Sequence, residues 1–132
     1  MKTALRPVRL QVYAVVLVNT AEQWTYIEKQ FPNTRPGLFR GRQFLSRNFG
    51  TKRVVFLRGG ETRVLAAAAA QFGIDRWNPM LIMTTADEGV DAVESVAEVC
   101  EINGVRLISE PVAAANIEDS VPAAITYANR EA

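Results

Sequence analysis

Hydrophobic residues fall into four short runs, separated by longer segments in which they recur with a helical period. The runs are rich in β-branched side chains and cover residues 8–18, 53–58, 80–85 and 105–109. Runs of this length and composition predict β-strands. The segments at 21–31, 61–72 and 87–103, and a last one after Ser120, predict helices.

Strand and helix alternate along the chain, and this alternation determines the predicted fold. It is typical of parallel strands joined by helical crossovers. We therefore predict a single three-layer α/β domain over residues 1–132, with a mainly parallel four-stranded sheet flanked by helices, Rossmann-like or flavodoxin-like. Residues 32–50 hold two prolines and three glycines. They are longer than a crossover requires, so we expect an irregular basic insertion there.

Two sequence signals predict helix boundaries. Gly73 stands where a left-handed C-terminal cap would end the second helix. Ser120 followed by Val121 and Pro122 predicts the start of the last helix, because proline is tolerated in a first turn.

The composition is that of one ordinary domain. The chain has 132 residues, 48% of them hydrophobic, which suffices for a core without disulfides. A lone Cys100 cannot pair within the chain and favours a reducing compartment, so we expect a cytoplasmic protein. The apolar run at 12–18 has seven residues, too few to span a bilayer, and no membrane partner is expected.

The formal net charge of +1 conceals a strong asymmetry. Up to Arg63, twelve Lys and Arg against three Asp and Glu give +9, while the remainder, with three and eleven, carries −8. Such a division of charge favours either an anionic partner that binds the basic part or head-to-tail association of copies of this chain.

The positive charge is concentrated in a segment interleaved with phenylalanines. Guanidinium groups bind phosphate oxygens and aromatic rings stack on unpaired bases, so this composition suits single-stranded nucleic acid. The alternative is that the phenylalanines anchor a loop to the core while the arginines are solvated. The candidate binding residues are Arg35, Arg40, Arg42, Arg47, Lys52, Arg53, Arg58, Arg63, Phe39 and Phe44.

The negative charge forms a stripe on the third predicted helix. Asp87, Asp91, Glu94, Glu98 and Glu101 are spaced by four and three residues and share one face. A solvated face is the ordinary explanation, and an electropositive neighbour is the alternative. The carboxylates do not converge, so we expect no metal and no cofactor.

A strand runs through two glycines into an alanine-rich helix. Glycines let a backbone approach a ligand closely, although this turn lacks the spacing of both the dinucleotide and the phosphate-loop motifs. The order of elements, carried by Arg58, Gly59, Gly60 and residues 66–73, resembles the Rossmann-like nucleotide-binding families. The resemblance assigns a role to no residue.

Polar residues follow each predicted strand. Because ligands of open α/β sheets bind at the carboxyl ends of the strands, these residues form a candidate ligand edge. They are Asn19, Thr20, Gly59, Gly60, Glu61, Thr84, Thr85 and Glu110. Histidine is absent, which excludes histidine-based triads, and Glu61 or Glu110 would be the carboxylate of any enzyme.

Three functional hypotheses follow. The first is a non-catalytic binding protein whose Arg/Phe segment holds an anionic partner, above all nucleic acid. The second is a homo-oligomeric adaptor in which the basic segment of one copy meets the acidic helix of another. The third is a nucleotide or phosphate ligand, with or without carboxylate catalysis, at the strand-end edge.

Overall fold

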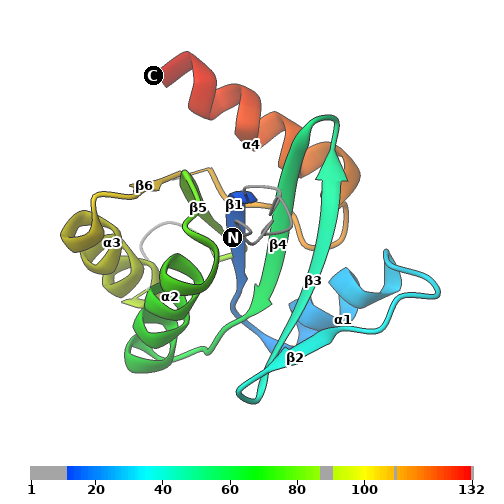
Figure 1. The fold of residues 1–132 in the computed structure, drawn as a ribbon, viewed down its shortest axis with the longest axis horizontal. Coiled ribbons are helices and arrows are strands. Elements are labelled where there is room, and N and C mark those ends of the chain that lie inside the picture. The colour runs from blue at the N-terminus through cyan, green and yellow to red at the C-terminus, as the bar shows by residue number, and fades with distance from the viewer. Residues whose placement is uncertain (1–11, 87–90, 109, 132) are drawn as a thin grey trace, which may run out of the picture.

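Four helices and six strands make up the part of the chain that the computed structural model describes, residues 12–86, 91–108 and 110–131 (Figure 1). The strands are β1 (Val12–Val18), β2 (Gly37–Phe39), β3 (Arg42–Phe49), β4 (Lys52–Arg58), β5 (Leu81–Thr84) and β6 (Arg106–Leu107). The helices are α1 (Ala21–Lys29), α2 (Arg63–Trp77), α3 (Asp91–Asn103) and α4 (Ile117–Glu131). Parts of the first and last predicted strands (8–11 and 109) and of the third predicted helix (87–90) lie outside the described residues.

The strands form one sheet in the order β2-β3-β4-β1-β5-β6. Strands β4, β1, β5 and β6 are parallel, and β2 and β3 add an antiparallel hairpin at one edge. In the central strand β1, Val15 pairs with both Val55 and Ile82. The apolar run of β1 is continuous because helices cover both faces of the sheet at this strand.

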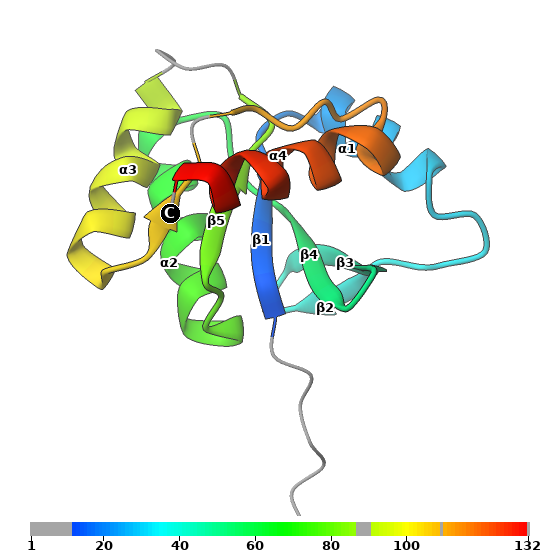
Figure 2. The same ribbon diagram turned by 90° about the horizontal axis from the view of Figure 1, so that it is seen from above.

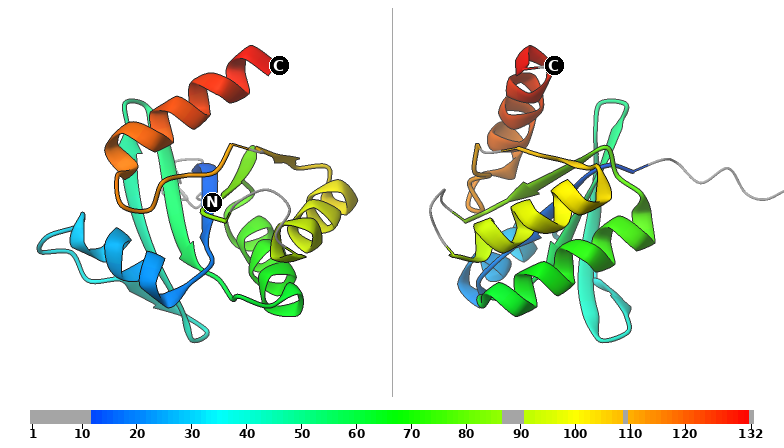
Figure 3. Two further views of the ribbon diagram at one scale, coloured as in Figure 1. Left: turned by 180° about the vertical axis from the view of Figure 1, so that it is seen from behind. Right: turned by 90° about the vertical axis from the view of Figure 1, so that its left-hand side faces the viewer.

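Helices α1 and α4 cover one face of the sheet, and α2 and α3 cover the other. Phe56 belongs to the buried cluster that includes Trp24 of α1 and Ala124 of α4, whereas its neighbour Leu57 belongs to the cluster on the opposite face, which includes Ala70 of α2. Figure 2 shows α4 crossing in front of the strands with α2 behind them, and Figure 3 shows α2 and α3 side by side. The predicted three-layer α/β fold is confirmed.

The predicted number of strands and the irregular insertion are wrong. Residues 37–49 form the two strands β2 and β3, so the sheet has six strands rather than four. Arg40 and Gly41 have φ angles of 50° and 80°, which suits the tight two-residue turn between Phe39 and Arg42. The segment therefore extends the sheet and turns its aromatic side chains toward the domain.

Both predicted helix boundaries are also displaced. Gly73 lies inside α2, where a Cβ would come within 3.3 Å of Val15 Cγ1, so its small size permits close packing rather than ending the helix. The left-handed cap is Asn78, with φ of 46°. Helix α4 begins at Ile117, ahead of Ser120, because Asn116 Oδ1 accepts a hydrogen bond from the Asp119 amide at 3.3 Å.

Within the described ranges, no helix has both the length and the apolar character needed to cross a membrane.

Candidate functional site at the carboxyl ends of the strands

The candidate site lies where the connections after two neighbouring strands diverge. Strand β1 leads into α1 on one face of the sheet, and β5 leads toward α3 on the opposite face. Two crossovers that leave adjacent parallel strands in opposite directions open a crevice at the carboxyl ends of those strands, where ligands of this fold class bind. The β1/β5 crevice is the topological switch point of this sheet.

The Gln23 side chain holds the base of the β1/β5 crevice together. Its Nε2 donates to the Thr85 carbonyl at 3.1 Å, and its Oε1 accepts from the Thr85 hydroxyl at 2.7 Å. The same Oε1 accepts from the Thr20 amide at 3.2 Å, while Thr20 Oγ1 accepts from the Gln23 amide at 3.0 Å. This capping box therefore starts α1 and ties β1 to β5 at the same time.

Asn19 is the unusual residue of the crevice. It is only 5% exposed, and its backbone amide donates to Thr85 Oγ1 at 3.2 Å. Its side-chain Oδ1 is buried and accepts a hydrogen bond from no other group of the described residues. A buried acceptor without a partner costs about 1–3 kcal/mol, so structures retain few of them.

The β1/β5 crevice has a volume of about 380 Å³, within the range of small-molecule sites. Among the described residues, Glu61 is the only ionisable one that lines the crevice, and it comes from a third strand end, the turn after β4. Ala86 and Ala92 provide small apolar surface. The site combines amide and carboxylate oxygens, which accept hydrogen bonds, with an apolar wall. It therefore suits a ligand that carries hydroxyl or amino donors on an apolar frame.

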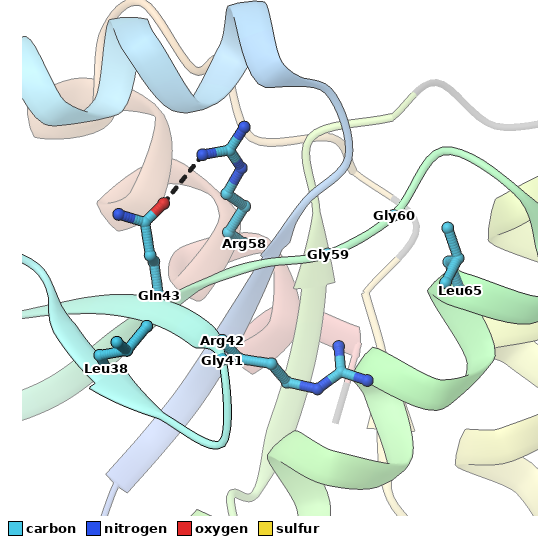
Figure 4. Close-up of a pocket in the computed structure, with 8 residues that line it drawn as sticks. All are labelled: Leu38, Gly41, Arg42, Gln43, Arg58, Gly59, Gly60 and Leu65. Carbon is cyan, nitrogen blue, oxygen red and sulfur yellow. Dashed lines mark hydrogen bonds between the residues drawn. The ribbon is translucent and has the colours of Figure 1, made fainter.

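A second cavity, of about 410 Å³, lies beside the Gly59–Gly60 turn (Figure 4). It is lined by the β2–β3 hairpin and by the turn from β4 to α2, with residues Leu38, Gly41, Arg42, Gln43, Arg58, Gly59, Gly60 and Leu65. We call it the hairpin pocket. A Cβ on Gly60 would come 2.1 Å from Leu65 Cβ, so this turn requires glycine to pass so close to α2.

The predicted ligand edge is therefore divided between two cavities. Asn19, Thr20, Glu61 and Thr85 line the crevice, whereas Gly59 and Gly60 line the hairpin pocket. Thr84 is buried, with its hydroxyl donating to the Ala86 carbonyl at 3.2 Å. Glu110 is exposed and lines neither cavity.

Gln23 was not among the predicted site residues. The spacing of Thr20 and Gln23 matches a capping box and was the available signal. Its bridge to Thr85, 62 residues away, exists only because β1 and β5 are adjacent. Within the described ranges, no group of three His, Cys, Asp or Glu side chains is placed to hold a metal ion.

The structure separates the residues of the predicted Arg/Phe surface. The Phe39 ring lies 5.6 Å from that of Phe72, and the Phe44 ring lies 5.3 Å from that of Trp77, so both rings pack against α2. Only Arg42 and Arg58 line a cavity described above. Arg47 of β3 pairs with Glu118 of α4. The other basic candidates, Arg35, Arg40, Lys52, Arg53 and Arg63, lie outside the crevice and the hairpin pocket.

The acidic stripe is a solvent-exposed helix face. Asp91, Glu94, Glu98 and Glu101 of α3 are exposed, and none of the four pairs with a cation of the described residues. Asp87 lies outside the described residues.

Comparison with known proteins finds similar solved structures. No family model and no curated protein matches the chain. A Helicobacter pylori MTAN variant with 5'-methylthioadenosine in its active site is 13% identical over 58% of this chain and 33% of its own, with a TM-score of 0.49. The Streptococcus pneumoniae 5'-methylthioadenosine/S-adenosylhomocysteine nucleosidase with a transition-state inhibitor is 17% identical over 58% and 36%, with a TM-score of 0.47. Futalosine hydrolase of Helicobacter pylori is 13% identical over 58% and 34%, with a TM-score of 0.48. The chain spans about a third of the length of these proteins.

The prediction of a non-catalytic nucleic-acid-binding protein is wrong. The physical reason lies in the fold, because the rings expected to stack on bases are packed against α2 instead. The predicted homo-oligomeric adaptor has no support either, since the described carboxylates of the acidic helix face are exposed to solvent.

Proposed function

We propose that this chain binds a small molecule of the nucleoside class in the β1/β5 crevice. The observation that carries the proposal is the buried Oδ1 of Asn19, which has no partner among the described residues and belongs to a side chain that lines the crevice. A ligand that donates a hydrogen bond to this amide oxygen would remove the cost of leaving it unsatisfied.

The class of ligand follows from the chemistry of the lining. The Asn19 amide and the Glu61 carboxylate offer acceptors to the hydroxyl groups of a ribose, while Ala86 and Ala92 offer apolar contact to a base. Gln23 is a poor contact for a ligand, because its Oε1 accepts two hydrogen bonds within the protein and its Nε2 donates to Thr85. We assign it the role of positioning the two strand ends.

Glu61 supports a further step in the same site. Of the carboxylates that the structure describes, it alone lines the crevice, and it is exposed, so water can reach it. A carboxylate beside a bound nucleoside is placed to activate a water molecule. We therefore include hydrolysis of the bound nucleoside in the proposal. Glu61 takes a proton from a water molecule while the water oxygen bonds to C1′ of the ribose, the bond from C1′ to the nucleobase breaks, and the nucleobase leaves with the proton that Glu61 returns to it. The expected location is the cytoplasm, where the lone Cys100 stays reduced.

Isothermal titration calorimetry with adenosine, inosine and 5'-methylthioadenosine tests binding, and chromatography of the same mixtures tests release of the free base. Asn19→Leu should abolish binding. Glu61→Gln should weaken binding about tenfold, because a hydrogen bond to a charged group contributes about 1.5–3 kcal/mol. Glu110→Gln is the matched control, since Glu110 is a strand-end carboxylate that lines neither cavity. Absence of heat with every nucleoside at millimolar concentration, or full binding by Asn19→Leu, would contradict the proposal.

A further inference from the structure

The hairpin pocket has a chemistry opposite to that of the crevice. Its two ionisable lining residues in the described ranges are Arg42 and Arg58, and none of the described carboxylates lines it. The single ion pair found in the described ranges joins Arg47 to Glu118, so neither pocket arginine is neutralised by a described carboxylate. The pocket therefore presents two positive charges that the described residues leave without a counter-charge.

Both guanidinium groups are held in place by neutral partners. Arg58 Nη1 donates to Gln43 Oε1 at 2.8 Å, which uses one of its five N–H donors. The Arg42 guanidinium lies over the ring of Phe72, with its Cζ 5.2 Å from the ring centre. Stacking of this kind occupies the face of the group and leaves the N–H groups at its edge available. Such pre-orientation lowers the entropic cost of binding an oxyanion.

The two arginines lie on opposite sides of the strand end. Arg58 follows Phe56 by two residues and so faces the side of α1, whereas Arg42 reaches Phe72 on the side of α2. Figure 4 shows the two guanidinium groups on either side of Gly59, directed away from each other. The two guanidinium groups cannot both bind one small anion, but they lie at two ends of the same cavity.

We propose that the hairpin pocket binds a small molecule with two separated oxyanion groups, one at Arg42 and one at Arg58. The apolar body between the two groups would lie against Leu38 and Leu65, which line the pocket and are 68% and 51% exposed. The class is a dicarboxylate or a bisphosphate of matching length. This site is separate from the crevice, with which it shares no lining residue.

Calorimetric titration of the whole chain at low salt with dicarboxylates of increasing length, each paired with the monocarboxylate of equal length, tests this proposal. The dicarboxylate whose length fits the pocket should bind about tenfold more tightly than the monocarboxylate of equal length, because a second charge-assisted hydrogen bond forms. Arg42→Gln and Arg58→Gln should each bring this ratio close to one. A parallel titration with terminal bisphosphonates of the same lengths shows whether phosphate-type or carboxylate oxygens bind better.

Arg53→Gln is the matched control. Arg53 lies on the same strand as Arg58, but its guanidinium donates to Ser46 and lines neither cavity. Its replacement should keep the tenfold ratio. Equal affinity of both acids for the wild type, or an equal loss of the ratio in Arg53→Gln and Arg42→Gln, would overturn the proposal. Nucleoside binding should be unchanged in Arg42→Gln and Arg58→Gln, so failure of one site is distinguishable from failure of the other.

Discussion

Replacement of Asn19 by leucine should make the protein more stable while it removes ligand binding. The buried Oδ1 of Asn19 has no hydrogen-bond partner among the described residues, and leucine has a similar branched shape. Removing an unsatisfied buried acceptor recovers about 1–3 kcal/mol. The backbone amide of Asn19 donates to Thr85 independently of the side chain, so this contact persists in the variant.

The stability change is large enough to measure in a melting experiment. For a domain of this size, 1 kcal/mol corresponds to about 4 °C in Tm, so Asn19→Leu should melt about 4–12 °C higher than the wild type. Circular dichroism during heating, without ligand, gives this difference. Urea unfolding at fixed temperature checks that the free energy of unfolding rises with an unchanged slope.

Thr84→Val is the matched control for this experiment. Thr84 is a buried polar residue of β5 close to the site, but its hydroxyl is satisfied by the Ala86 carbonyl. Its replacement should lower stability by about 1 kcal/mol, opposite in sign to Asn19→Leu. If Asn19→Leu also lowers the Tm, Asn19 Oδ1 accepts a hydrogen bond in solution. The argument that a ligand supplies the missing donor at Asn19 then fails.

Four further results are expected. Gly60→Ala should destabilise the fold by about 1–3 kcal/mol in urea unfolding, because the new Cβ would come 2.1 Å from Leu65 Cβ. Unchanged stability would mean that the turn can move away from α2. Trp77→Ala should lower the free energy of unfolding by about 3 kcal/mol, because the Trp77 ring packs against the rings of both Phe44 and Phe72. The backbone amides of the β2–β3 hairpin should then exchange their hydrogens faster, and protection equal to that of the wild type would show that the hairpin is stable without Trp77. Burial raises the pKa of Cys100 from 9.0 to about 11, so the thiol ionises at lower pH in the unfolded chain than in the folded one. The free energy of unfolding should therefore fall by up to about 3 kcal/mol between pH 9 and 11. Cys100→Ala should remove this loss of stability, and a loss that persists in the variant would come from other groups. Glu118→Gln, which breaks the exposed pair with Arg47, should change the Tm by less than about 3 °C, and a larger fall would show that the pair ties β3 to α4 more strongly than surface pairs do.

The sequence alone determined the parallel part of the fold. Strands β1, β4 and β5 each contain a short apolar run that is buried on both faces, and such runs are recognisable locally because consecutive positions are apolar. It also indicated that the carboxyl ends of these strands would carry the ligand edge, since this follows from the direction of parallel strands. Asn19, Thr20, Glu61 and Thr85 were among the residues predicted there, and they line one crevice.

Tertiary structure decided what local patterns do not encode. The hairpin of β2 and β3 forms because Phe39 and Phe44 find Phe72 and Trp77 on α2, and those contacts join residues far apart in the chain. Read locally, the same arginines and phenylalanines indicated a surface for nucleic acid. The hydrogen bonds between Gln23 and Thr85 likewise form because β1 and β5 are adjacent. The same adjacency buries the unpartnered amide oxygen of Asn19. A hydrogen bond between distant residues exists only once the sheet order brings them together, and no spacing along the sequence specifies that order.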